Sequence, residues 1–233
     1  MSKNIEISKY RNIEISNKNM GIIKPAKCKI CRRVGKKLFL KGEKCLTQKC
    51  PMVTKPYPPG IRGKRRKGGL SEYGRELMEK QKLKHWYNLQ ERQFKKYVKE
   101  VLEESRKKGE DATQALIRRL ESRLDNVVFR LGFADSRAQA RQLVAHGHFL
   151  LNGKPVNIPS IELRKGDVVQ VKPSSQKKAI FKNLALLKLK KHQPPSWLKL
   201  DVSEMKGEVI GVPSLEEASP PAEISSIFEF YSK

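Results

Sequence analysis

The chain has 233 residues, and its 50 lysines and arginines against 24 aspartates and glutamates give a formal net charge of +26. Its length leaves room for one or two domains with real cores, and so high a charge is extreme for a globular enzyme and indicates a polyanionic partner, most often RNA or DNA. No stretch approaches the ~20 apolar residues of a membrane span, and no secretory signal is evident, which favours a cytoplasmic protein.

Residues 1–24 contain a short repeat, because Asn4–Ser8 returns as Asn12–Ser16. Alternating isoleucines in both copies are compatible with two short strands. A flexible extension that orders only on a partner is the interpretation we favour for this segment.

Every cysteine of the chain lies within residues 25–50, with the spacing C-x2-C-x13-C-x4-C: Cys28, Cys31, Cys45 and Cys50. Two thiolates two residues apart can reach one metal ion, and a second pair completes the tetrahedron of a structural zinc site. A four-thiolate iron–sulfur cluster is the main alternative. Free or disulfide-bonded cysteines are a third, although a cytosolic setting argues against disulfides.

Residues 51–70 form a linker rich in proline, glycine and basic residues. Glycines let the backbone approach a phosphate closely, and lysines and arginines neutralise it, so the linker is expected to bind nucleic acid. A solvated flexible tether is the alternative.

Residues 71–112 are expected to form a helical domain. Ser71 is a plausible helix start, and the apolar stripe from Phe94 to Leu102 has helical spacing. Gly109 follows two lysines and ends the second helix. His85, Trp86 and Tyr87 lie between the two helices, where we favour buried packing over a base-stacking platform.

A compact α/β unit is expected over 113–174. Apolar residues at steps of three and four predict one helix from Leu116 to Leu131, stopped at Gly132, and Ser136 begins a second helix. Asn152-Gly153 is a strong hairpin-turn signal between two strands, and a further strand is predicted over 168–171.

Basic residues recur at helical spacing within this unit and line one predicted face, which suits a phosphate backbone. A solvated charged face is the alternative. Together with the cysteine loop, linker and helices they give the predicted RNA-binding set: Arg32, Arg33, Lys36, Lys37, Lys41, Arg62, Lys64, Arg65, Arg66, Lys67, Lys84, Arg92, Arg119, Arg123, Arg130, Arg137, Arg141, His146 and His148.

After Val171 the chain is expected to form a basic helix over 177–191, stopped by Pro194-Pro195. A strand is predicted over 207–212. The alternation from Ile227 to Tyr231 predicts a last strand.

Several separated motifs resemble the small-subunit ribosomal protein S-four family, over about 25–233. They are Lys37–Gly42, Ser71–Gly74, Glu91–Phe94, Leu120–Val128, Arg137–Leu143, His146–His148, Lys165–Val168, Pro195–Leu198 and Phe230–Lys233. The four cysteines resemble the metal-binding type of that family.

The resemblance implies an α+β fold. A helical domain of 71–112 and 175–200 would hold an inserted RNA-binding domain of 113–174 and 205–233, with the C-terminal strand joining its sheet. It also implies a structural role in the small subunit. The expected partners are 16S rRNA at a multi-helix junction of the 5′ domain, the S-five protein and other neighbouring proteins, and mRNA. Nucleation of 30S assembly, an influence on translational accuracy and autoregulation are expected with them.

Two other classes remain open. An RNA-modifying enzyme could carry the same small RNA-binding domain, but Asp125, Asp135 and Asp167 have no partner acid or base in the sequence pattern, no phosphate-loop motif is present, and no catalytic residue is assigned. A zinc-dependent regulator would be expected to bind duplex DNA at least as well as structured RNA.

Overall fold

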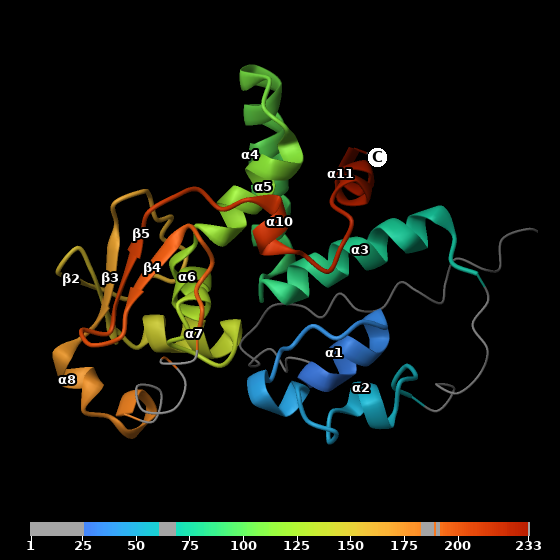
Figure 1. Cartoon of the computed structure of the whole chain (residues 1–233). Coiled ribbons are helices and arrows are strands. Elements are labelled where there is room, and N and C mark those ends of the chain that lie inside the picture. The colour runs from blue at the N-terminus through green and yellow to red at the C-terminus, as the bar shows by residue number, and fades with distance from the viewer. Residues whose placement is uncertain (1–25, 61–68, 183–188, 190–191, 233) are drawn as a thin grey trace, which may run out of the picture.

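The computed structural model describes residues 26–60, 69–182, 189 and 192–232. Within them the chain forms a small cysteine-containing module, a helical layer and an antiparallel sheet with helices on one side (Figure 1). The predicted α+β class is confirmed in this respect. None of the helices in the described part of the chain is long and apolar enough to cross a membrane.

The cysteine module consists of α1 (Lys27–Val34), a 3-10 turn (Gly42–Cys45) and α2 (Pro51–Thr54). Gly35 ends α1 in the left-handed conformation, with φ of 76°. The module lies below α3 in Figure 1.

The helical layer is built from α3 (Glu72–Trp86), α4 (Glu91–Lys108), α5 (Ala112–Glu121), α10 (Leu215–Ala218) and α11 (Ser225–Ser232). The predicted start and end signals are confirmed. The Ser71 hydroxyl accepts a hydrogen bond from the Gly74 backbone N–H, and Gly109 ends α4 with φ of 69°. Phe94, Val98 and Val101 pack in this core with Leu116 and Ile227.

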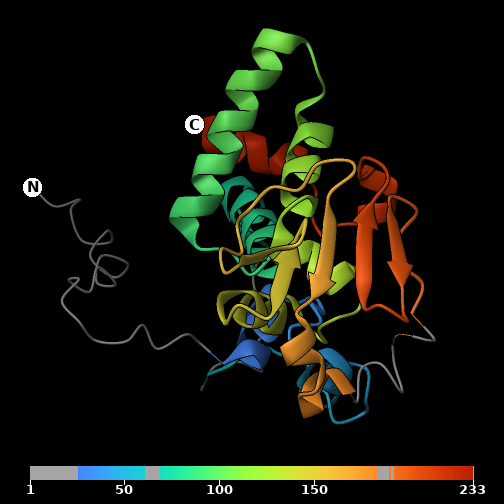
Figure 2. The same cartoon turned by 90° about the vertical axis from the view of Figure 1, so that its left-hand side faces the viewer.

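The sheet contains β1 (Phe149–Leu151), β2 (Lys154–Val156), β3 (Val168–Val171), β4 (Leu198–Asp201) and β5 (Lys206–Val209) in the order β2-β1-β3-β5-β4, all antiparallel. The predicted Asn152-Gly153 turn joins β1 to β2 with φ of 50° and 80°. Helices α6 (Leu124–Arg130) and α7 (Arg137–Ala145) share the apolar core of the sheet, and α8 (Pro173–Gln176) follows β3 (Figure 2).

Two predictions about elements are corrected here. The expected single helix from Leu116 to Leu131 is two helices, because α5 ends at Glu121 and α6 begins at Leu124. The predicted C-terminal strand is wrong, since Ile227–Tyr231 lies in helix α11, which packs on α3. The sheet is completed by β5, which confirms the strand predicted over 207–212, and by β4, which was not predicted.

The segment after 175 also packs differently from the prediction. Phe181 and Leu189 are buried in the core of the sheet and not in the helical layer. Residues 179–182 are helical, and the rest of the expected helix, apart from Leu189, lies outside the described residues up to 191. The expected extension 1–24 lies outside them too.

Candidate nucleic-acid interface

The four cysteines of the cysteine module line one small cavity. Cys31, Cys45 and Cys50 are buried, and Cys28 is half-buried. The Lys41 backbone N–H donates to Cys45 Sγ at 3.4 Å. Burial raises the pKa of the Cys31 thiol, and the charges of the other three cysteines raise it further.

The four thiols line the same cavity but do not form a closed set of ligands in this structure. Within the residues that the structure describes, no group of three or more histidine, cysteine, aspartate or glutamate side chains is placed to hold a metal ion. The expected metal-bound loop is therefore not supported by this arrangement.

Some basic side chains of the cysteine module make contacts within the protein. Arg32 Nε donates to the Tyr57 carbonyl at 2.8 Å, and Lys36 Nζ donates to the Pro221 carbonyl at 2.9 Å. Arg33, Lys36 and Lys41 are exposed, and Lys37 is half-buried with its ammonium 5.9 Å from the Phe39 ring centroid. The predicted linker residues lie outside the described part of the chain: Arg62, Lys64, Arg65, Arg66 and Lys67.

The predicted arginine face is corrected first at Arg123, which is 2 % exposed. Its guanidinium makes two hydrogen bonds to the Asp125 carboxylate, at 3.0 and 2.7 Å, and a third to the Tyr97 hydroxyl. A charge buried with its partner can make no contact with a phosphate at the surface. The pair lies where α5 gives way to α6, so Arg123 organises the helix break.

Glu121 is the centre of a second buried network and is fully buried. Its carboxylate accepts two hydrogen bonds from Arg130, at 2.9 and 2.8 Å, one from the Tyr87 hydroxyl at 2.7 Å and one from Asn126 Nδ2 at 2.6 Å. Burial opposes ionisation, but the hydrogen bonds and charge of Arg130 outweigh it and hold the pKa of Glu121 below its ordinary value. Arg130 is therefore committed to the fold.

Arg137 is also turned inward, with a side chain 9 % exposed. Its guanidinium carbon lies 3.9 Å from the Trp86 ring centroid, 4.6 Å from that of Phe129 and 5.0 Å from that of Tyr87. Burial lowers the pKa of Arg137 to about 10, which still leaves the group charged at neutral pH. Tyr87 is buried, and Arg137 lies over the Trp86 ring, which agrees with the expectation that these aromatic residues are packed within the fold.

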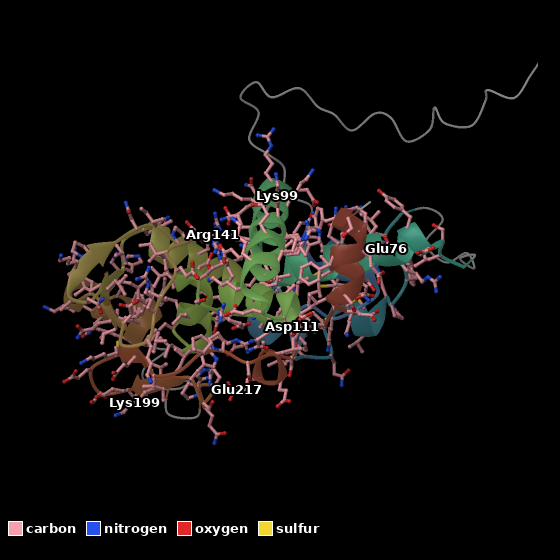
Figure 3. All side chains as sticks on the ribbon, turned by 90° about the horizontal axis from the view of Figure 1, so that it is seen from above. Glu76, Lys99, Asp111, Arg141, Lys199 and Glu217 are labelled. Carbon is pink, nitrogen blue, oxygen red and sulfur yellow. The ribbon has the colours of Figure 1, made fainter. Side chains whose placement is uncertain are left out.

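The remaining predicted residues are more accessible. Arg141 has a side chain 36 % exposed and Arg119 one 26 % exposed, with Arg119 paired to Glu100 at 2.9 Å. Arg92 is exposed, whereas Lys84 is 11 % exposed and pairs with Glu91. In Figure 3 Arg141 lies toward the same edge of the molecule as Lys99, and Lys199 and Glu217 lie toward the opposite edge.

His146 and His148 lie near two lysines that the sequence prediction omitted, Lys172 and Lys178. Together these four residues form an accessible basic patch, called the His146–His148 corner. His146 is exposed, and the two rings lie 6.1 Å apart. Burial and then the positive charges of Lys178, His146 and Lys172 lower the pKa of His148. The sequence signal for this patch was the set of lysines after β3, because Lys172 follows the strand directly and Lys177 and Lys178 come soon after it.

Comparison with known proteins is consistent across the chain. Residues 23–121 match the family model "Ribosomal protein S4/S9 N-terminal domain", and residues 122–169 match the model "S4 domain". Small ribosomal subunit protein uS4 of Heliobacterium modesticaldum is 48 % identical over 88 % of this chain and 96 % of its own length. The Thermotoga maritima protein of the same name is 47 % identical over the same shares, and uS4A of Bdellovibrio bacteriovorus is 45 % identical over 92 % and 100 %.

Proposed function

Since the chain belongs to the ribosomal protein uS4 family, we propose that it binds 16S ribosomal RNA as a structural component of the small ribosomal subunit in the cytoplasm. The observation that carries this proposal is similarity to uS4 proteins over nearly the whole of both chains. Because this similarity extends over nearly the whole matched region, no separate part of that region is left for a catalytic domain. The family is one of structural ribosomal proteins and not of enzymes.

The binding mechanism is electrostatic and shape-directed. Exposed Arg33 and Lys41 of the cysteine module, and exposed Lys172 and Lys178 near His148, present cations to the phosphates of a folded RNA junction. The buried arginines act differently, because their contacts join α6 and α7 to the helices of the helical layer. The RNA therefore meets a preshaped surface and not a set of independent side chains.

Finer roles belong to the same proposal. The RNA site is a multi-helix junction of the 5′ domain, and binding there nucleates 30S assembly. Contacts with the S-five protein, with other neighbouring small-subunit proteins and with mRNA would connect the chain to translational accuracy, and binding to its own mRNA would provide autoregulation. The high net charge of +26 supports this many contacts with polyanions.

A structural zinc ion in the cysteine module is likewise a proposal. Four thiols line one cavity within a segment too small to hold a large core, so closure of the thiols around one ion would stabilise it. Cys28, Cys31, Cys45 and Cys50 would be the ligands, and zinc would neutralise their thiolates without any catalytic step. A four-thiolate iron–sulfur cluster is the alternative.

Co-sedimentation tests the ribosomal role. The chain, expressed with an affinity tag, should travel with small subunits through a gradient after a wash at high salt. Recovery only in the unbound fractions, with small subunits intact, would remove the structural role.

A further inference from the structure

A cavity of about 100 Å³ opens where three parts of the fold meet. The cysteine module contributes Leu38 and Phe39, the end of α3 contributes Trp86, and α6 and α7 contribute Phe129 and Ala138. Its size is of the order of the ~150 Å³ cavity that holds one benzene ring, so it suits one planar ring and not an extended ligand. An aromatic and aliphatic lining favours the same kind of occupant.

Two residues that line this cavity have backbone conformations in the left-handed region. Phe39 has a φ of 52°, a region that bulky residues rarely adopt, and its side chain remains 45 % exposed beside the cavity. Asn88 also has a positive φ, of 55°, directly after α3. Strain of this kind gathers at binding sites, where the surrounding structure holds it.

Polar groups in the lining have hydrogen-bonding capacity left. Among the described residues, neither the Asn88 amide nor the His85 ring makes a side-chain hydrogen bond, and Arg137 Nη2 is buried without a hydrogen-bond partner. Burial lowers the pKa of His85 to about 4, so its ring is neutral at pH 7 and can both donate and accept. Donors and acceptors beside an aromatic wall are what reads the edge of a base.

We infer that this three-way cavity takes one unstacked nucleobase of the bound ribosomal RNA. The inference rests on the proposed function and adds to it a contact that reads a base and not a phosphate. Lys27 also lines the cavity. Insertion of a base would join the cysteine module, the helical layer and the sheet at one point of the RNA.

The test compares two substitutions on the same helix. Ala138→Leu fills the cavity from α7, and Ala145→Leu adds the same atoms to α7 at an exposed position outside the cavity. Binding of a 16S 5′-domain transcript is measured by filter binding, and base-specific chemical probing locates protected nucleotides. Circular dichroism checks that both variants fold, and Asn88→Gly removes the amide while tolerating the positive φ, so it serves if Ala138→Leu does not fold.

The expected result is about tenfold weaker binding by Ala138→Leu, as for the loss of one stacked base, with loss of protection at a single unpaired nucleotide and no change for Ala145→Leu. Unchanged affinity and an unchanged footprint in folded Ala138→Leu, or in Asn88→Gly, would overturn the inference and leave the proposed function intact. A uniform loss of all protections would overturn it too, since it would show only damaged docking of the modules. Failure of the unsubstituted chain to bind the transcript would instead overturn the proposed function.

Discussion

The guanidinium carbon of Arg137 lies 3.9 Å from the centroid of the Trp86 ring, although α7 and α3 belong to parts of the chain that match two different family models. Nε of the same guanidinium donates to Asn126 Oδ1 at 2.7 Å, and Nη2 lies 3.8 Å from Glu121. The two parts are therefore held together by a buried cation against an aromatic ring, next to a buried carboxylate.

Removal of that cation should destabilise the fold. We expect Arg137→Ala to lower the free energy of unfolding by about 3 kcal/mol. The substitution leaves a cavity among the aromatic rings around the guanidinium and removes a positive charge near buried Glu121. Urea denaturation followed by circular dichroism measures this.

Arg141→Ala is the matched control on the same helix. Its side chain is 36 % exposed and its ion pair with Asp125 spans 3.5 Å. We expect little change in stability and a smaller salt slope of RNA binding, by about one unit for a lost phosphate contact. Equal loss of stability in both variants would contradict the assignment of Arg137 to the interior.

Sequence reasoning succeeded where a local signal decides the backbone. Asn152-Gly153 adopts the two positive φ values that its turn requires, and the Ser136 hydroxyl accepts a hydrogen bond from the Gln139 N–H at the start of α7. Gly109 ends α4 for the same kind of reason. Such signals act over three or four residues and need no knowledge of the tertiary fold.

Prediction failed where distant partners decide the outcome. Ile227 to Tyr231 alternate like a strand. However, Ile224, Ile227 and Phe228 also have helical spacing and suit a helix that covers α3. Arginine spacing revealed a shared face but not its direction, because burial depends on Glu121 and Asp125. Those two acids, placed within the same basic stretch, were the available sign that the arginines have internal partners.

Acid should weaken the helical layer through Glu91. Burial alone would raise the pKa of Glu91, but hydrogen bonds from Lys80 and Lys84 outweigh it and lower the pKa to about 2. An unfolded glutamate titrates near ~4.3, so between these pH values the unfolded state binds more protons. The stabilisation is complete above the unfolded pKa and is lost as the pH falls toward about 2.

The measurement is the free energy of unfolding of Glu91→Gln and of the unsubstituted chain between pH 7 and pH 3. The difference between them should shrink as the pH falls. Glu103→Gln, an exposed substitution on the same helix, is the control and should show a much smaller dependence. A constant difference for Glu91→Gln across this range would show that the Lys80 and Lys84 contacts do not act on its ionisation.

Docking of the cysteine module can be tested with a pair of glycines. A Cβ on Gly42 would lie 2.5 Å from the Asp135 carbonyl oxygen at the start of α7, whereas a Cβ on Gly35 would meet nothing within 4 Å. Both have positive φ, so Gly35→Ala reports the backbone cost alone, about 1 kcal/mol.

Gly42→Ala should cost more than Gly35→Ala, because the module must move away from Asp135. Limited proteolysis should then cut within the cysteine module of Gly42→Ala first. Identical stability and identical cleavage of the two variants would show that the contact with α7 does not hold the module in place.

The cysteine module should contain one zinc ion per chain when the protein is purified from zinc-supplemented cells. Elemental analysis measures it, and Cys45→Ser should lower the zinc content and increase proteolysis of residues 26–60. Iron together with visible absorption would favour the cluster, and the absence of both metals from folded protein would refute the metal proposal.

The most direct test of the central claim is competition between a 16S 5′-domain transcript and duplex DNA of equal length for the purified chain, measured by filter binding over a range of salt concentrations. A uS4-type RNA binder should prefer the transcript at every salt concentration and keep that preference as salt weakens both complexes. Equal or tighter binding of duplex DNA would contradict the account.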